Sequence, residues 1–264
     1  MKRSKLITVL GFAPGALFAP AARVQNALPF PFTSSAFIAG LCALLVVGVN
    51  IATAQQPSIP ERVVALKANV AASQLILRQY EWIETTVVSL KGEEKSRKQE
   101  RCYYGADGGV QKVEVSQSPE PAKKRGLRGR IAKRKKEELT DYMKNAVSLV
   151  KTYVPPNPAK IQAARDAGKV SIELLEPGRR ARLNFRDYEK PGDNFGVEVD
   201  LLNNRPLGVK VSTYLDDAKD AVTLDVRMGQ LNDGTTYASD ITLDAKAKNL
   251  AVNVQNSGYR KTGN

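Results

Sequence analysis

Six acidic residues between positions 187 and 220 could supply general acid–base chemistry. They are Asp187, Glu189, Asp193, Asp216, Asp217 and Asp220. Glycoside hydrolysis needs only two carboxyl groups, so the residue types are sufficient. However, the Asp pairs fall in segments that we predict to be turns, where an aspartate usually accepts hydrogen bonds from its own backbone. The spacing therefore favours turns over a hydrolytic site, and it matches no calcium loop.

The absence of histidine excludes several other chemistries. The chain has 264 residues, no histidine and two cysteines. Ser-His-Asp triads, Cys-His dyads and His-ligated metal sites all need an imidazole. Two cysteines are too few for a Cys₄ zinc site or a disulfide framework. We therefore expect a binding protein that is not an enzyme and that holds no metal and no cofactor.

A basic segment, Lys123–Lys136, holds much of the positive charge. The chain has 40 Lys and Arg against 27 Asp and Glu, a formal net charge of +13. Four basic residues lie in residues 1–54 and nine in this segment, so the remaining 27 balance the 27 acidic residues. The nine are Lys123, Lys124, Arg125, Arg128, Arg130, Lys133, Arg134, Lys135 and Lys136.

Two interpretations of this basic segment remain open. Clustered Lys and Arg attract polyanions by counterion release, and they attract anionic lipid surfaces. The second interpretation is a solvated, flexible linker over residues 118–136. For an exported protein we expect an anionic membrane surface or lipopolysaccharide as the partner, and no nucleic acid.

The first 54 residues have the features of an export signal. They contain four basic residues and no acidic one, an apolar run over Ala36–Val49, and the motif Ala52-Thr53-Ala54. This combination predicts a secretory signal peptide cleaved after Ala54 and a periplasmic location. An uncleaved anchor is the alternative, although the run is shorter than the ~20 residues of a spanning helix. Cleavage would leave one domain, residues 55–264, with Cys102 as its single cysteine. We expect this thiol to be a buried small hydrophobe, and a reactive or intermolecular role is the alternative.

The rest of the chain divides into a mixed first half and a second half of strands. Spacing predicts helices over about 60–80, 131–153 and 158–167. Between the first two we expect a three-strand meander over 82–90, to Tyr104, and 110–115. From Lys169 onward apolar residues alternate with polar ones between short turns, which predicts six or seven antiparallel strands with one polar face.

This order of elements resembles the LolA-like group of periplasmic lipoprotein carriers, over most of residues 58–260. The segments YEWIETTVVSLKGE (Tyr80–Glu94) and VQNSGYRK (Val254–Lys261) are also similar to a set of uncharacterised exported bacterial proteins. The resemblance implies an α+β fold, in which a strongly curved antiparallel sheet, an open half-barrel, is covered by two main helices. It also implies that the concave apolar face holds acyl chains, but it carries over no individual binding residue.

The apolar face of the second-half strands is the candidate site for a lipid or lipoprotein. A curved sheet larger than its covering helices leaves a cavity of the kind that binds small apolar ligands. Alternatively, the helix bearing Leu139, Met143 and Val150 fills that space as core, and the protein is an interaction or structural module of the cell envelope. Trp82 and the tyrosines Tyr103, Tyr104 and Tyr214 are candidates for the edge of the opening, although aromatic residues are common in strands without any function. The candidate lining residues are Leu183, Phe185, Val197, Val199, Val209, Val211, Val222, Leu224, Val226 and Ile241.

Overall fold

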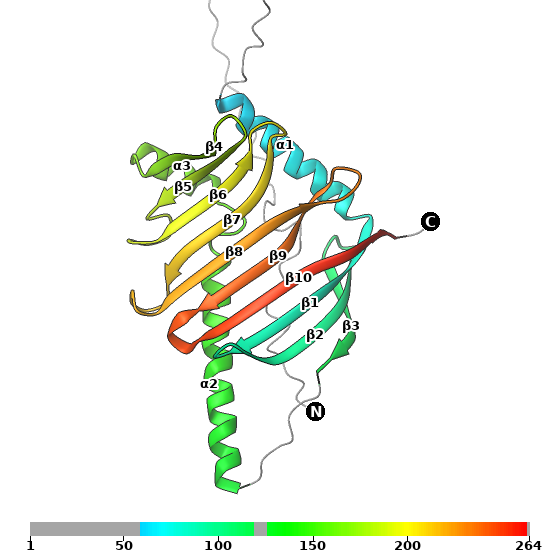
Figure 1. Ribbon diagram of the computed structural model, residues 1–264, viewed down its shortest axis with the longest axis vertical. Helices are drawn as coiled ribbons and strands as arrows, with labels where there is room; N and C mark the ends of the chain where they lie inside the picture. The colour runs from blue at the N-terminus through cyan, green and yellow to red at the C-terminus, as the bar shows by residue number, and fades with distance from the viewer. Residues whose placement is uncertain (1–58, 119–125, 263–264) are drawn as a thin grey trace, which may run out of the picture.

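A computed structural model describes residues 59–118 and 126–262 (Figure 1). The helices are α1 (Ile59–Leu77), α2 (Gly126–Val150) and α3 (Pro158–Asp166). The first strands are β1 (Tyr80–Leu90), β2 (Glu93–Tyr104) and β3 (Val110–Gln117). The second set is β4 (Val170–Glu176), β5 (Arg180–Arg186), β6 (Asn194–Asp200), β7 (Arg205–Tyr214), β8 (Ala221–Gln230), β9 (Thr236–Ala245) and β10 (Leu250–Lys261). The predicted meander and the expected six or seven later strands are therefore confirmed.

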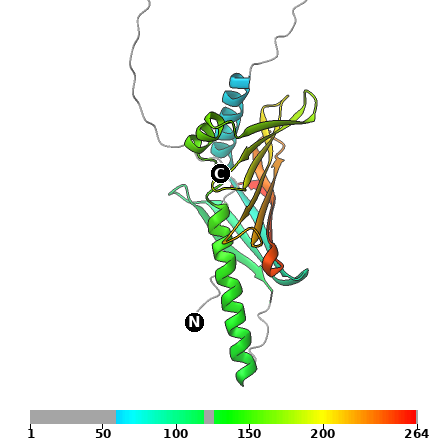
Figure 2. The same cartoon turned by 90° about the vertical axis from the view of Figure 1, so that its left-hand side faces the viewer.

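All ten strands form one open antiparallel sheet in the order β3-β2-β1-β10-β9-β8-β7-β6-β5-β4. Every pair of neighbouring strands in this order is consecutive in the chain except β1 and β10, the C-terminal strand. This pairing joins the two meanders, and β3 and β4 are left as the edges. The sheet curves, and the helices lie on one side of it (Figure 2).

We call the face that carries the helices the inner face, and the opposite one the outer face. Period-two alternation places valine, leucine and isoleucine on the inner face, because successive strand side chains point to opposite sides. Cross-strand partners such as Val209 and Val226, or Val226 and Ile241, continue this layer from strand to strand. The result is a contiguous buried cluster that runs from β5 to β10.

Helix α2 begins earlier than its sequence pattern predicts. It starts at Gly126 rather than near residue 131, and it ends at Val150 rather than 153. The apolar periodicity that predicted it begins only at Leu139, so the exposed first turns give no such signal. Residues Gly126–Lys136 of the basic segment are thus helical, and Figures 1 and 2 show this end of α2 extending beyond the sheet.

Two predictions fall outside the described part of the chain. The expected signal peptide, residues 1–54, lies there, and so do Lys123, Lys124 and Arg125 of the basic segment. Within residues 59–118 and 126–262, the helices are all too short or too polar to cross a membrane.

Candidate functional site

The structure brings the ten predicted lining residues together on the inner face. Nine of them are buried, with exposures of 0–8%, and Leu183 is partly buried at the edge of the same cluster. They come from β5, β6, β7, β8 and β9. The alternation of the strands therefore identified one continuous apolar surface correctly.

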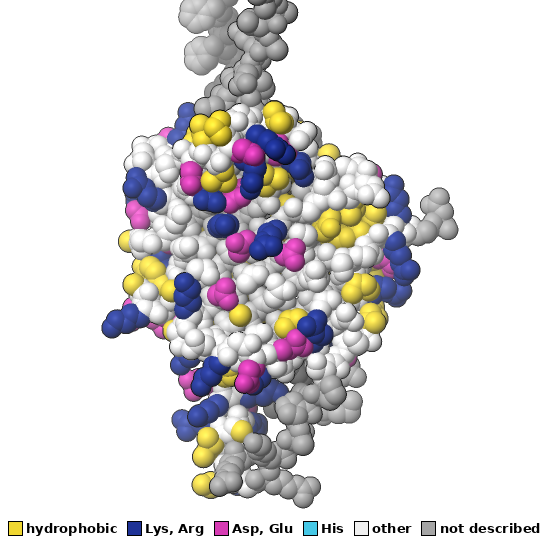
Figure 3. Space-filling view, in the orientation of Figure 1, with side chains coloured by type: hydrophobic (Ala, Val, Ile, Leu, Met, Phe, Trp, Pro, Cys, Tyr) yellow, Lys and Arg dark blue, Asp and Glu magenta, His cyan; other side chains and the backbone are white. Residues whose placement is uncertain are grey.

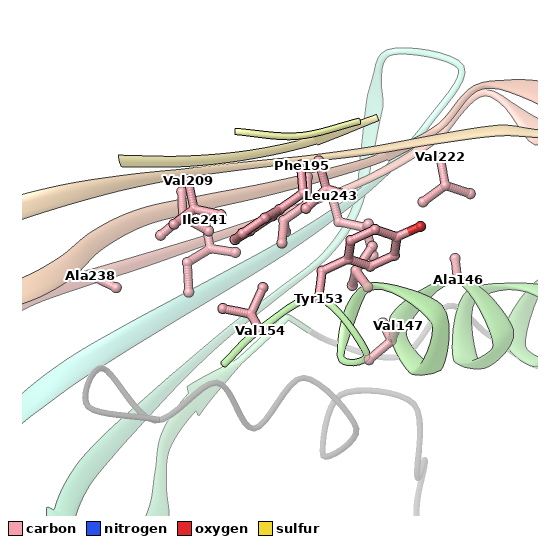
Figure 4. Packing of buried hydrophobic residues seen from close by; sticks show 14 of the residues in the cluster. Ala146, Val147, Tyr153, Val154, Phe195, Val209, Val222, Ala238, Ile241 and Leu243 are labelled. Carbon is pink, nitrogen blue, oxygen red and sulfur yellow. The ribbon is translucent and has the colours of Figure 1, made fainter. Parts of the chain in front are cut away.

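The C-terminal half of α2 packs against this surface. Met143, Ala146, Val147 and Val150 are at most 4% exposed and belong to the same cluster as the sheet residues. The chain that follows the helix adds Tyr153 and Val154, which Figure 4 shows beneath Phe195, Ile241 and Leu243. The apolar surface is thus in contact with protein side chains over β5–β9.

Tyr153 fixes the end of this helix to the sheet. Its buried hydroxyl donates to Asp193 at 2.5 Å and bonds Thr213 at 2.8 Å. The Asp193 carboxylate also accepts the backbone N–H groups of Tyr188, Glu189 and Lys190. Burial, together with the bond to Asp193, raises the pKa of Tyr153 above its usual range. This arrangement holds a loop and a helix end in place, and it leaves no carboxyl oxygen of Asp193 directed at a substrate.

Four of the other acidic candidates also have structural partners, and two of these partners are backbone groups of the turns, as predicted. Asp187 accepts the backbone N–H of Gly192, and Asp217 accepts that of Lys219. Two further members of the set bond side chains on helices: Glu189 pairs with Lys160 at 2.5 Å, and Asp220 accepts the hydroxyl of Tyr142. In these contacts the four carboxylates each bond a different partner, and no bond between them is needed to explain their positions.

The helical part of the basic segment is exposed. Side chains of Arg130, Lys133, Arg134, Lys135 and Lys136 all face solvent. Leu127 is 76% exposed and Ile131 is 54% exposed. A spacing of four residues places these two side chains on one face of the helix. The first three turns of α2 therefore form a basic amphipathic helix that contributes none of the described core residues.

The outer face carries a different hollow, which is charged. A pocket of about 440 Å³ lies over β5–β8, with Arg180, Arg205 and Lys210 among its walls beside Glu198 and Asp225. Figure 3 shows basic and acidic side chains interspersed on this face. Burial opposes the ionisation of Glu198, but the Arg182 guanidinium at 2.5 Å holds the pKa of Glu198 below its ordinary value. Such ion pairs suit contact with water and do not suit an acyl chain.

A polar section of the inner face was missed by the sequence analysis. Glu84 on β1 is 1% exposed, and it lies directly across from Glu100 on β2 and Asn256 on β10. Lys112 reaches Glu84 at 2.5 Å, and Lys98 reaches Glu100 at 2.5 Å. The alternation Trp82, Glu84, Thr86, Val88 was a usable signal, because it places a glutamate on the face of an apolar series.

Aromatic rings adjoin this polar section. Trp82 is 1% exposed, so the expectation that it edges an opening was wrong. Its ring stacks on Tyr259 with centroids 5.6 Å apart and contacts Tyr104 at 5.7 Å, while its indole N–H donates to Asn256 at 3.1 Å. Cys102, its cross-strand partner, is fully buried, as expected for an unreactive thiol. Burial raises the pKa of Cys102 to about 12.

Comparisons with known proteins give fold-level likeness only. No protein-family model matches the chain, and no curated protein matches its sequence. The chain is similar to the crystal structure of a DUF1329 family protein from Desulfovibrio piger, with 10% identity and a TM-score of 0.31, covering 76% of this chain and 92% of that one. It is also similar to a LolA superfamily protein from Nitrosomonas europaea, with 10% identity and a TM-score of 0.29, covering 74% of this chain and 94% of that one.

Proposed function

We propose that this is an exported, non-catalytic protein that binds a lipid or acylated ligand against the apolar inner face of its sheet. In the same proposal the basic end of α2 contacts an anionic membrane surface or lipopolysaccharide. One observation carries both parts: α2 has a buried half that packs on the apolar face and an exposed basic half that extends beyond the sheet. The proposal includes a periplasmic location.

The inner face supplies the apolar contact. A ligand chain on this face would replace contacts that α2 now makes through Met143, Val147 and Val150. Because burial of apolar area is non-directional, an acyl chain and a helix side chain stabilise such a surface in the same way. The ligand and the C-terminal half of α2 therefore compete for one surface, and binding requires α2 to move away from the sheet.

The basic half of α2 supplies the surface contact. Each Lys or Arg near an anionic lipid surface contributes about 1 kcal/mol at moderate ionic strength, so five contribute on the order of 5 kcal/mol. Leu127 and Ile131 add apolar side chains, as is typical of helices that lie in the membrane interface. A surface contact at this end would place the membrane beside the helix that a ligand must displace.

The lipid part is tested by mass spectrometry of an organic extract of the purified protein and by titration with a fluorescent fatty acid. Val147→Ala removes two buried methyl groups from the α2 contact, which weakens that contact by about 1.5 kcal/mol and tightens fatty-acid binding by up to about tenfold. Lys144→Ala, an exposed change in the same helix, leaves the affinity unchanged. Absence of extracted lipid together with absence of uptake by both variants contradicts the lipid part.

The surface part is tested by co-sedimentation with vesicles of equal phosphatidylglycerol and phosphatidylethanolamine. One variant replaces five basic residues of α2 by glutamine, namely Arg130, Lys133, Arg134, Lys135 and Lys136. Its affinity for these vesicles at low salt should fall by more than about a thousandfold. A control variant loses the same charge at five exposed lysines elsewhere, namely Lys67, Lys91, Lys151, Lys219 and Lys246. Equal losses in both variants would mean that net charge acts and not the helix.

A second candidate function is favoured by the packed contact between α2 and the sheet. In this alternative the interior is ordinary core, and the protein is an interaction or structural module of the envelope that meets anionic surfaces through α2. The Val147→Ala variant discriminates the two, because loosening a plain core lowers stability without creating fatty-acid binding.

A further inference from the structure

The polar section of the inner face combines five charged side chains from three adjacent strands. They are Glu84 on β1, Lys98 and Glu100 on β2, and Lys112 and Glu114 on β3. Direct cross-strand pairing sets Glu84 beside Glu100, and Glu100 beside Glu114. We call these five residues the inner charged cluster. Its three carboxylates face two ammonium groups, so the cluster has one negative charge in excess when all five are ionised.

One carboxylate oxygen of the cluster has no partner. Glu84 Oε1 accepts from Lys112 at 2.5 Å, and the Thr86 hydroxyl lies 3.5 Å away. Among the described residues, no donor bonds Glu84 Oε2, although the residue is 99% buried. Leaving a buried charged oxygen unbonded is costly, because its hydration is lost and nothing replaces it. A native structure that keeps such a group needs an explanation.

Neighbouring residues fit a positively charged partner. Trp82 lies two residues from Glu84 on the same strand face, stacked with Tyr259. The Tyr259 hydroxyl is a second buried polar group without a bond among the described residues. Burial is the main cause that raises the pKa of Tyr259, followed by two neighbouring tyrosines, Cys102 and Glu84. Aromatic faces attract cations as well as apolar groups. The cluster therefore offers a free acceptor, an excess negative charge and an adjoining aromatic wall.

The cluster is continuous with the apolar surface. Along β1 the same face carries Glu84, Thr86 and Val88, and their β10 partners are Asn256, Val254 and Val252. Val252 and Val254 belong to the large apolar cluster. A molecule with a polar head at Glu84 and a hydrocarbon chain can thus lie on a single face, with its chain directed toward β9 and β8.

We infer that the inner charged cluster is a head-group site for an amphiphile that carries a protonated amine. The ammonium group donates to Glu84 Oε2 and supplies the positive charge that the cluster lacks, while the chain lies on the apolar surface. This inference rests on the proposed function, because it names the class of ligand for the same inner face. Anionic fatty acids are weaker ligands under this inference, since their carboxylate meets the excess negative charge.

The test uses three probes of equal chain length: dodecylamine, dodecanol and dodecanoate, each below its micelle concentration. Trp82 is the single tryptophan of the chain and lies beside Glu84, so its emission reports binding at this end of the face. We expect dodecylamine to bind about tenfold or more tightly than either other probe, as a charge-assisted hydrogen bond to a buried group implies. Glu84→Gln should reduce dodecylamine affinity to that of dodecanol and leave dodecanol binding unchanged.

A matched control separates this site from general charge effects. Glu93→Gln removes the same charge from an exposed position on β2 outside the cluster, where the side chain is 75% accessible, and should change dodecylamine affinity by less than about threefold. Equal affinity of the wild-type protein for all three probes overturns the head-group inference while leaving lipid binding intact. Failure of all three to bind overturns the proposed function as well. The comparison of the three probes uses only the wild-type protein, so it tests the head-group inference even if Glu84→Gln does not fold.

Discussion

Tyr153→Phe tests whether the bond network at the end of α2 holds the helix on the sheet. The Tyr153 hydroxyl is buried, and it donates to the charged oxygen of Asp193 while bonding Thr213. A hydrogen bond to a charged group contributes about 1.5–3 kcal/mol to stability, against about 1 kcal/mol for a neutral one. Asp193 keeps its three backbone N–H donors in the variant, so its carboxylate remains largely satisfied. We therefore expect a loss of about 2 kcal/mol, in the lower part of the charged range.

The assay is urea unfolding at pH 7, followed in parallel by Trp82 emission and by far-ultraviolet circular dichroism. Tyr142→Phe is the matched control, because Tyr142 donates to Asp220 from a partly buried position on α2 itself. The unfolding free energy lost in Tyr142→Phe should stay below about 1 kcal/mol, since water can replace the hydrogen bond at this position. If Tyr153→Phe costs no more than Tyr142→Phe, the argument that this network fixes α2 is refuted.

Two further predictions concern strand packing and the buried glutamate. At Gly208 a Cβ atom would lie 2.7 Å from the Val226 carbonyl oxygen, so Gly208→Ala must separate β7 from β8 and should cost about 1–3 kcal/mol in thermal or urea unfolding. Gly196→Ala, whose nearest neighbour is the Asn184 side chain at 3.2 Å, should cost less; a reversed order would contradict the steric argument. Burial, which outweighs the attraction of Lys112 and is assisted by Glu100, raises the pKa of Glu84 above the ordinary value of a glutamate, about 4.5. Its contribution to stability is therefore greatest below about pH 4.5 and is lost as pH rises through the folded-state value. The unfolding free energy of Glu84→Gln should therefore rise relative to that of the wild type between about pH 4.5 and pH 7. If the two proteins show parallel profiles of unfolding free energy against pH, the pKa of Glu84 is not raised.

Local patterns in the sequence were enough to predict most elements and one face of the sheet. Alternation with a period of two depends only on strand geometry, so it assigned Val209, Val211 and Leu224 to a common apolar side without knowledge of their partners. The turn positions of Asp187 and Asp217 likewise predicted bonds to nearby backbone, because such bonds form within a few residues. The resemblance in element order agreed with the single open antiparallel sheet.

Contacts between distant segments required the tertiary structure. β1 lies beside β10, about 170 residues away, because the two meanders join there, and no local pattern specifies that choice. The join buries Trp82 against Asn256 and sets Glu84 across from Asn256. It therefore encloses the ion pair that Glu84 makes with Lys112. The packing of Val147 and Val150 on the apolar face was equally undetermined, since an apolar residue satisfies core and ligand site alike. The sequence by itself thus determined which strand side chains share a face, because alternation is a local property. The long-range packing decided which of these side chains form a buried charged cluster, which form the core, and which part of α2 stays exposed.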